Sequence, residues 1–339
     1  MARLPEAAGA TAGPTSLPWV DSNGAVLQIA RALAPDKTVW IDFDPPQEAK
    51  QAAEAYMLAV ADAASYGAKW AISLDDALRA DLAAKKQPAV ETWKKVAGML
   101  AFFEQHKHAR TYQPGGLLAI VSNFAGPDWD TAEEAINLLP RLRQPCRVIA
   151  RSRATDASFA GLQAIFYVDR EPPDPALRQK LIAFARGGGI LFVPSTWPNP
   201  EGQPVPAEPY LLFGVRALGK GRLAVCKEAG PDSYDTVADI QNIMSHRNDL
   251  LRLYNALSMN FLYETSAQGG QAIIHMLNYS RRPASDGPLF YVKEPHQSAR
   301  LVSPEIASPA ELQWVPQEAG GAELTVPRIS VYGAIEMEK

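Results

Sequence analysis

The chain has few cysteines and no long apolar run. Its 339 residues include only Cys146 and Cys226, which form neither a CxxC motif nor a disulfide framework. No apolar run reaches the roughly 18 residues that cross a bilayer, so the sequence predicts no membrane partner. Residues 1–18 lack the apolar core of a signal peptide, and the cellular location stays unknown.

Basic charge and cofactor motifs are also scarce. Lys and Arg number 33 against 37 Asp and Glu, which gives a net charge of −4 and no basic field for nucleic acid. There is no Walker A motif and no HExxH motif, and the histidines lack the clustering of metal ligands. The glycines at 187–189 follow a predicted helix, which is a helix cap and not a phosphate loop. We therefore expect no cofactor and no metal.

Alternation of helix and strand marks the first folded segment, residues 23–112, after a flexible lead-in over residues 1–22. Helices are predicted over 26–34, over 47–66 and from Pro88, with strands over 38–43 and 69–74 between them. This order is typical of parallel β/α units. A complete (β/α) barrel needs about 250 residues, so the segment predicts only part of one.

Two further segments follow, a doubly wound domain of flavodoxin type over 113–258 and an antiparallel β-sandwich over 259–339. In the first, apolar strands over 117–121, 147–150, 164–168 and 190–194 alternate with helices, followed by a hairpin over 215–227 and a helical pair over 234–258. In the second, strands are predicted over 271–277, 289–292, 299–302, 312–315 and 330–338. The fold class is thus α/β with several domains.

Carboxylates at predicted strand ends are the candidate chemical groups. In a (β/α) barrel the carboxyl ends of the strands face the active site, and paired carboxylates can cleave a glycosidic bond. Turn formation, helix capping and core packing are the competing interpretations of the same residues. The candidates are Asp42 and Asp44 as catalytic residues, with Trp40, Trp70, Asp75 and Asp76 as sugar-binding residues.

Nucleophilic thiol chemistry is disfavoured. An amidase of this α/β type would place a cysteine on the turn after the strand over 164–168, where Asp169, Arg170 and Glu171 stand instead. Cys146 precedes a strand, at the wrong end for such a site, and Cys226 lies in the hairpin. Both cysteines are predicted to be small core residues that do not react with alkylating agents.

The segment order resembles that of β-galactosidases and related glycoside hydrolases. AIFYVDREPPDPALRQKLIAFARGGGILFVPS is similar to their amidotransferase-like trimerisation domain, and WKKVAGMLAFFEQHKH to the end of their catalytic barrel. IIHMLNYS and LTVPRISVYGAIEME resemble their terminal β-domain. The resemblance covers residues 23–339 and implies a carbohydrate partner, and a homo-oligomer or a segment that completes the barrel. Such relatives are often exported.

The chain departs from this family in its barrel. The family's acid and nucleophile lie on the fourth and seventh strands, and the fourth is absent here. If residues 38–43 correspond to the seventh strand, Asp42 or Asp44 lies near the nucleophile's place, where the family carries Glu. We expect the C-terminal portion of a longer or degenerate hydrolase, active if the barrel is completed. The alternative is a non-catalytic oligomerisation or carbohydrate-binding module.

Overall fold

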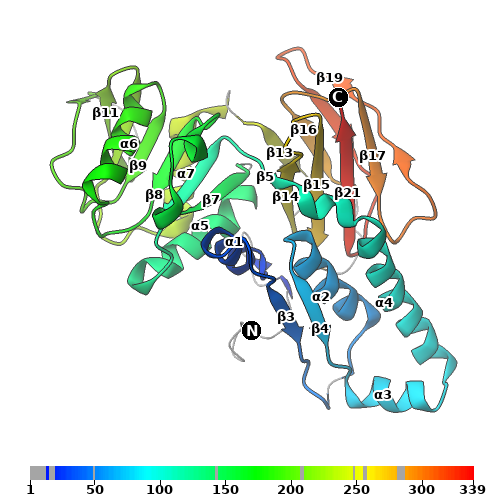
Figure 1. The fold of residues 1–339 in the computed structure, drawn as a ribbon. Helices are drawn as coiled ribbons and strands as arrows, with labels where there is room; N and C mark the ends of the chain where they lie inside the picture. Colours follow the sequence, from blue (N-terminus) through cyan, green and yellow to red (C-terminus); the bar gives the residue numbers. More distant parts are fainter. Residues whose placement is uncertain are drawn as a thin grey trace. The chain divides into compact units, whose positions relative to one another are not determined.

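The computed structural model describes residues 13–14, 20–48, 50–141, 144–206, 210–246, 249–254, 258–280 and 287–339. Most of the predicted lead-in over 1–22 lies outside these residues; within it, β1 (Gly13–Pro14) pairs antiparallel with β2 (Val20–Asp21). The chain divides into two compact units (Figure 1). Unit 1 takes Met1–Arg31, Asp36–Gln113 and Leu253–Lys339, and unit 2 takes Ala32–Pro35 and Pro114–Arg252.

The first part of unit 1 alternates helices and strands, as predicted for residues 23–112. In chain order the elements are α1 (Gly24–Leu33), β3 (Trp40–Phe43), α2 (Ala53–Ser65), β4 (Lys69–Ile72), α3 (Asp76–Ala83) and α4 (Gln87–Gln105). The strands β3 and β4 pair in parallel. The helix α3 was not predicted; its N-cap Asp75 accepts a hydrogen bond from the backbone of Leu78. Pro88 opens α4, because proline is tolerated in the first helical turn.

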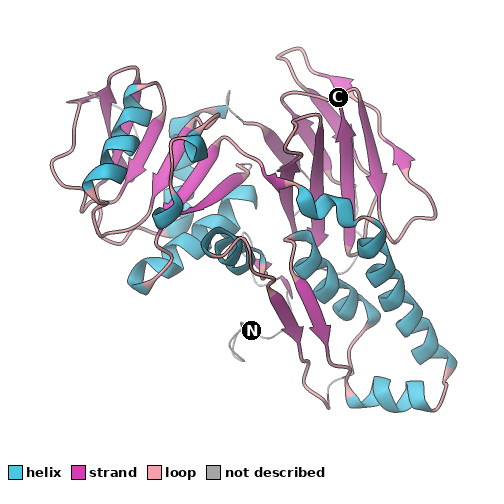
Figure 2. Ribbon diagram, in the orientation of Figure 1, coloured by secondary structure: helices cyan, strands magenta, loops and turns pink. Residues whose placement is uncertain are grey.

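Two sheets form the rest of unit 1 (Figure 2). The six-stranded sheet has the order β18-β17-β21-β15-β14-β5, and the four-stranded sheet the order β13-β16-β20-β19. Phe261 and Phe290, one from each sheet, meet edge to face with ring centroids 5.9 Å apart. The strands are β5 (Gln113–Pro114), β13 (Leu251–Tyr254), β14 (Met259–Thr265), β15 (Gln271–Asn278), β16 (Leu289–Val292), β17 (Ser298–Val302), β18 (Ala310–Glu311), β19 (Val315–Pro316), β20 (Ala322–Thr325) and β21 (Tyr332–Glu338).

Two predicted elements of this region are wrong. The continuous strand expected over 312–315 is absent, because β18 ends at Glu311 and β19 begins at Val315. The helical pair expected over 234–258 contains one helix, α7 (Ser233–Met244), followed by the strand β13. Ser245 ends α7 with a positive φ of 67°, a conformation that an α-helix cannot continue through. Apolar composition alone did not distinguish a second helix from a strand.

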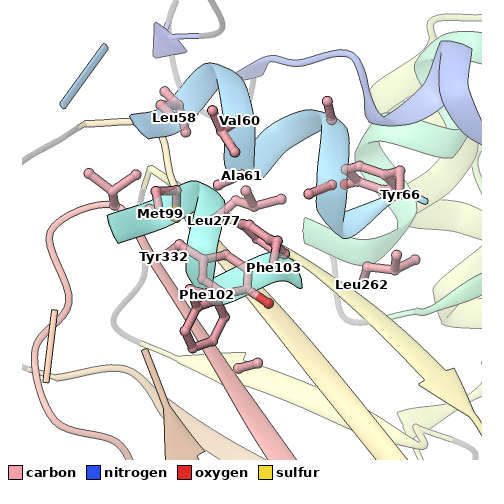
Figure 3. Packing of buried hydrophobic residues seen from close by; sticks show 14 of the residues in the cluster. Leu58, Val60, Ala61, Tyr66, Met99, Phe102, Phe103, Leu262, Leu277 and Tyr332 are labelled. Atoms are coloured by element: carbon pink, nitrogen blue, oxygen red, sulfur yellow. The ribbon is translucent and has the colours of Figure 1, made fainter. Parts of the chain in front are cut away.

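One hydrophobic core joins residues 23–112 to residues 259–339. The helices α2 and α4 cover one face of the six-stranded sheet, and their apolar side chains interlock with those of β14, β15 and β21 (Figure 3). The helix α2 is buried on nearly every side, which its Ala-rich sequence AEAYMLAVADAAS permits. Core residues labelled in Figure 3 are Leu58, Val60, Ala61, Tyr66, Met99, Phe102, Phe103, Leu262, Leu277 and Tyr332.

Unit 2 contains a seven-stranded sheet with the order β10-β11-β12-β9-β8-β6-β7. The strands from β12 to β7 run parallel, and the hairpin β11–β12 forms where it was predicted. Its turn needs glycine, since a Cβ on Gly221 would lie 2.1 Å from the carbonyl oxygen of Gly189. The strands are β6 (Leu118–Ser122), β7 (Cys146–Ala150), β8 (Ala164–Tyr167), β9 (Ile190–Val193), β10 (Gln203–Pro204), β11 (Phe213–Leu218) and β12 (Gly221–Cys226), and the other helices are α5 (Trp129–Arg141) and α6 (Pro175–Arg186).

Candidate functional site

The parallel pair β3–β4 has one face on the core and one face open. Ile41 and Phe43 are buried, whereas Trp40 is 45% exposed and Asp42 is half-buried. Successive strand residues point to opposite faces, so Trp40 and Asp42 share the open face. The Nζ atom of Lys69, across the ladder, lies 5.4 Å from the centroid of the Trp40 ring. This face therefore offers an aromatic surface beside a carboxylate.

Both outer edges of this pair lack a strand partner among the described residues, since β3 and β4 form a sheet of two strands. Parallel sheets are normally covered on both faces and extended at their edges. Asp44 follows β3 directly and is exposed, with the Gln47 side-chain amide 3.3 Å from its Oδ1. The structure thus brings Trp40, Asp42 and Asp44 to one accessible region.

The structure turns Trp70 away from that region. Its ring packs on the core side of β4, with its centroid 6.4 Å from that of Phe103. Trp40 and Trp70 therefore do not form two walls of one sugar site.

Asp75 and Asp76 serve local structure in this arrangement. Asp75 is fully buried, and its carboxylate accepts hydrogen bonds from Gln51 N, Leu78 N and the Tyr56 hydroxyl at 2.8–3.0 Å. Burial opposes the charged form, but these hydrogen bonds outweigh it and hold the pKa of Asp75 below its ordinary value. Asp76 is exposed and forms an ion pair with Arg79. Helix capping, one of the competing interpretations, describes the contacts of Asp75, whereas the carboxylate of Asp76 pairs with an arginine of the same helix.

A second group of polar side chains lies in the shared core and was not selected from the sequence. Glu264 of β14, Ile273 of β15 and Glu336 of β21 occupy one row across three strands. His275 lies two residues after Ile273 on β15 and therefore on the same face. We predicted that residues 330–338 form a half-buried strand, but β21 is buried at every residue except its last. The signal available in the sequence was ionisable residues within apolar runs, IIHML and GAIEME.

These side chains line a small pocket with a cavity volume of about 20 Å³, part of which is open to solvent. Phe102 and Phe103 of α4, with His106 directly after that helix, also line it, and the His106 ring stacks on Phe102 with centroids 4.1 Å apart. Tyr332 closes one side, with its ring centroid 4.8 Å from that of Phe103. Aromatic and polar side chains thus line the same small pocket.

Each carboxylate of the pocket has a guanidinium partner. Arg31 Nη1 lies 3.1 Å from Glu264 Oε1, and Arg300 places Nε and Nη2 at 2.9 and 2.8 Å from Glu336 Oε2. Glu264 is 3% exposed and Glu336 is 9% exposed, so both carboxylates are buried, and each is paired with an arginine.

His275 has one satisfied ring nitrogen and one unsatisfied one. Nδ1 lies 2.7 Å from the Tyr332 hydroxyl, and burial holds the pKa of that tyrosine well above 10.0, so the hydroxyl keeps its proton. Nε2 has no hydrogen-bond partner among the described residues, although Glu264 Oε2 lies 3.5 Å away. With Tyr332 donating to Nδ1, the neutral imidazole carries its proton on Nε2.

The turn after β8 in unit 2 contains no thiol. Asp169 is fully buried there and accepts hydrogen bonds from the Ser122 hydroxyl at 2.6 Å and from Asn123 N at 3.0 Å. Burial raises the pKa of the Asp169 carboxyl. Burial also raises the pKa of the Cys146 thiol, to about 12, and that of Cys226. Neither cysteine has the lowered pKa of a catalytic thiol.

Metal ligands and membrane spans were also sought in the described part of the chain. No group of three or more His, Cys, Asp or Glu side chains there is arranged to hold a metal ion. No helix of that part has both the length and the apolar character needed to cross a bilayer.

Solved glycoside hydrolases share this fold. A β-galactosidase from Bacillus circulans sp. alkalophilus matches with a TM-score of 0.62 and 10% identity, over 96% of this chain and 59% of that chain. The α-L-fucosidase isoenzyme 2 from Paenibacillus thiaminolyticus matches with a TM-score of 0.61 and 10% identity, over 93% and 62%. A catalytic mutant of Gan42B, a GH42 β-galactosidase from G. stearothermophilus, matches with a TM-score of 0.59 and 9% identity, over 93% and 56%.

The likeness is one of fold. It confirms the predicted mixed α/β architecture of a glycoside-hydrolase-like chain. This chain spans between 56% and 62% of the length of these enzymes. No protein-family profile matches the sequence, and no curated protein sequence does.

Proposed function

We propose that this chain is the C-terminal portion of a longer or degenerate glycoside hydrolase and that its ligand is carbohydrate. The observation that carries the proposal is the fold shared with a β-galactosidase and a fucosidase over at least 93% of this chain and over 59% and 62% of theirs. Full-length relatives would cleave a glycosidic bond with two carboxylates.

The segment from β3 to α4 corresponds, in this proposal, to the last units of a (β/α) barrel. Ile41 and Phe43 face the helices, and Trp40 and Asp42 would face the barrel interior, as alternate strand residues do. The open edges of β3 and β4 are consistent with a partner segment whose strands would pair in parallel with this pair. Such a segment would complete the active site.

Within that site we propose Asp42 and Asp44 as the carboxylates nearest the reaction and Trp40 as a platform for a sugar ring. Trp40 is exposed and lies on the face of Asp42, which supports this assignment. The predicted sugar-binding roles of Trp70, Asp75 and Asp76 stay predictions. The core position of Trp70 and the capping bonds of Asp75 favour the first three residues over them.

The remaining regions fit support roles in the same proposal. Unit 2, with its parallel sheet and helices, would be the amidotransferase-like domain that mediates homo-oligomer formation. The two antiparallel sheets of unit 1 would form the terminal β-sandwich, and the Phe261–Phe290 contact between them supports this. The alternative function is a non-catalytic oligomerisation or carbohydrate-binding module. Two observations favour it: the buried Asp169 stands where an amidase would carry a thiol, and residues 23–112 contain few β/α units.

The test is an activity and binding assay on the full chain with a panel of aryl glycosides. Turnover that is lost in Asp42→Asn or Asp44→Asn, but kept in the control Asp81→Asn on α3, would support the hydrolase. Sugar binding without turnover, lost in Trp40→Ala, would support the binding module, and light scattering would then report the oligomer. A strict monomer that binds no sugar would refute the binding module, and no turnover on any sugar would leave only the architecture of the hydrolase.

A further inference from the structure

The open face of β3–β4 carries charges of opposite sign at its two ends. Trp40 and Lys69 are partners in the first rung of the parallel ladder, and both side chains are exposed. Asp42 lies two residues further along the same face, and Asp44 follows the end of β3. We propose that this face binds a carbohydrate that bears an acidic group, with a sugar ring on Trp40 and the acidic group on Lys69. The inference rests on the proposed carbohydrate function and names the class of sugar.

Lys69 is a cation that has no carboxylate partner among the described residues. Three other lysines of unit 1 each lie 2.6–3.2 Å from a carboxylate oxygen, namely Lys86, Lys94 and Lys95. Lys69 forms no such pair with a described residue, and its Nζ lies 5.4 Å from the centroid of the Trp40 ring instead. A hydrogen bond of 2.9 Å from its backbone N–H to the carbonyl oxygen of Val39 holds Lys69 in the ladder. The ammonium group is therefore fixed beside an exposed aromatic ring, with its positive charge available to a ligand.

The neighbouring indole and ammonium groups match a sugar that carries an anionic oxygen. Trp40 is 45% exposed and offers apolar ring surface, against which the C–H face of a sugar can pack. The Lys69 ammonium can donate a charge-assisted hydrogen bond, which is stronger to a carboxylate or sulfate oxygen than to a neutral hydroxyl. A cationic sugar would be repelled by the same ammonium. Uronic acids and sulfated sugars share the required feature, an anionic oxygen attached to a sugar ring.

The two aspartates determine the direction in which such a ligand lies. At about 3.3 Å per strand residue, Asp42 lies roughly 7 Å and Asp44 roughly 13 Å along the strand from Trp40. An acidic group beside either aspartate would be repelled, whereas the same group at the opposite end of the face meets Lys69. Ala71, the ladder partner of Asp42, adds only a small side chain to the path between these ends. The acidic unit therefore lies at Lys69, and the rest of an oligosaccharide extends along β3 toward Asp44.

The experiment is calorimetric titration of the full chain with three trisaccharides: neutral galactotriose, trigalacturonate and a sulfated galactotriose. At low ionic strength we expect at least one acidic probe to bind about threefold more tightly than the neutral one, the effect of an exposed ion pair. The preference should disappear at roughly 1 M salt, where the screening length is about 3 Å. The two acidic probes distinguish a carboxylate from a sulfate ligand.

The outcomes separate this inference from the function on which it rests. If the neutral trisaccharide binds as tightly as both acidic ones, the acidic-sugar inference is overturned and the carbohydrate function stands. If none of the three probes binds, both are refuted. A preference for an acidic probe that is unchanged at high salt would also overturn the inference, because it would not arise from the Lys69 charge.

Variants locate the preference at Lys69. We expect Lys69→Gln to abolish the preference for acidic probes, Lys69→Glu to reverse it and Lys69→Arg to retain it, all without changing the affinity for galactotriose. Lys95→Gln is the matched control, because it makes the same change in net charge on α4, where Lys95 pairs with Glu54 of α2. Trp40→Ala should weaken binding of all three probes. A preference that survives Lys69→Gln, or that is lost in Lys95→Gln, would overturn the inference.

These substitutions are at exposed positions, so the variants should fold. Melting temperatures equal to that of the wild-type protein would establish this. Unchanged binding of every probe by folded Trp40→Ala would place the sugar elsewhere and refute the assignment of this face.

Discussion

Replacing Leu277 by alanine should loosen helices that lie more than 170 positions away in the sequence. Leu277 of β15 is fully buried in the core that also contains Leu58 and Ala61 of α2 and Met99 of α4. Leu→Ala at such a site removes transfer free energy and leaves a cavity, at a cost of about 2–5 kcal/mol. For a unit of this size the melting temperature should fall by roughly 10 °C.

Amide hydrogen exchange identifies which elements share that loss. If α2, α4 and the six-stranded sheet unfold as one unit, exchange protection in α2 should fall by the same free energy as protection in β15. Leu191→Ala provides the matched control, because Leu191 is equally buried but lies in the core of unit 2. It should loosen unit 2 and leave protection in α2 unchanged.

One pattern of hydrogen exchange would refute the shared core. If Leu277→Ala lowers protection in β15 and β21 while α2 and α4 keep wild-type protection, the helices have a core of their own. The shared cluster would then contribute little to holding the β/α segment on the sheet.

Three further perturbations test individual side chains. Asp75→Ala should lower the free energy of unfolding by about 2 kcal/mol, because it removes a helix cap and buried hydrogen bonds. Urea titration measures this loss, and a loss of stability as small as that caused by Asp76→Ala would contradict the capping role. Burial raises the pKa of Asp62 above 3.8, so the folded state binds the proton more tightly and stability should fall as pH rises from 3.8 through the higher folded pKa. Asp62→Asn should flatten that fall, and an identical slope in both proteins would contradict the assignment. Cys146, with a pKa of about 12, and the buried Cys226 should resist alkylation at pH 8 until urea unfolds the chain, as followed by mass spectrometry, and rapid labelling of native protein would show that they are accessible.

Local signals predicted most of the elements because they depend on neighbouring residues. The Asp174–Pro175 pair predicts the start of α6, and in the structure Asp174 accepts hydrogen bonds from Ala176 N and Leu177 N. The hairpin turn likewise has a local signal, because Gly219 takes a positive φ of 61° that glycine adopts readily. The strand β13 was missed because an apolar run is compatible with either helix or strand until its packing partner is known.

For the candidate site residues, too, some properties follow from the local sequence and others depend on tertiary contacts. Alternation along the strand places Trp40 and Asp42 on one face, which is a local property of β3. Whether that face is open depends on which other strands pair with β3, and the residues near β3 in the sequence do not indicate those partners. The pocket was not foreseen because Glu264, His275 and Glu336 come from three strands whose register brings them together.

By itself, the amino-acid sequence determined most of the helices and strands, the absence of a thiol after β8, and the alternation of faces along β3, because these follow from residues within a few positions of one another. Only the tertiary structure decided that residues 23–112 and 259–339 share one core, that Trp70 packs inward while Trp40 faces outward, and that two carboxylates and a histidine line a single pocket. The physical reason is that burial and charge pairing depend on strand register and helix packing between segments about 200 residues apart, and the energy of those contacts appears only when the segments meet.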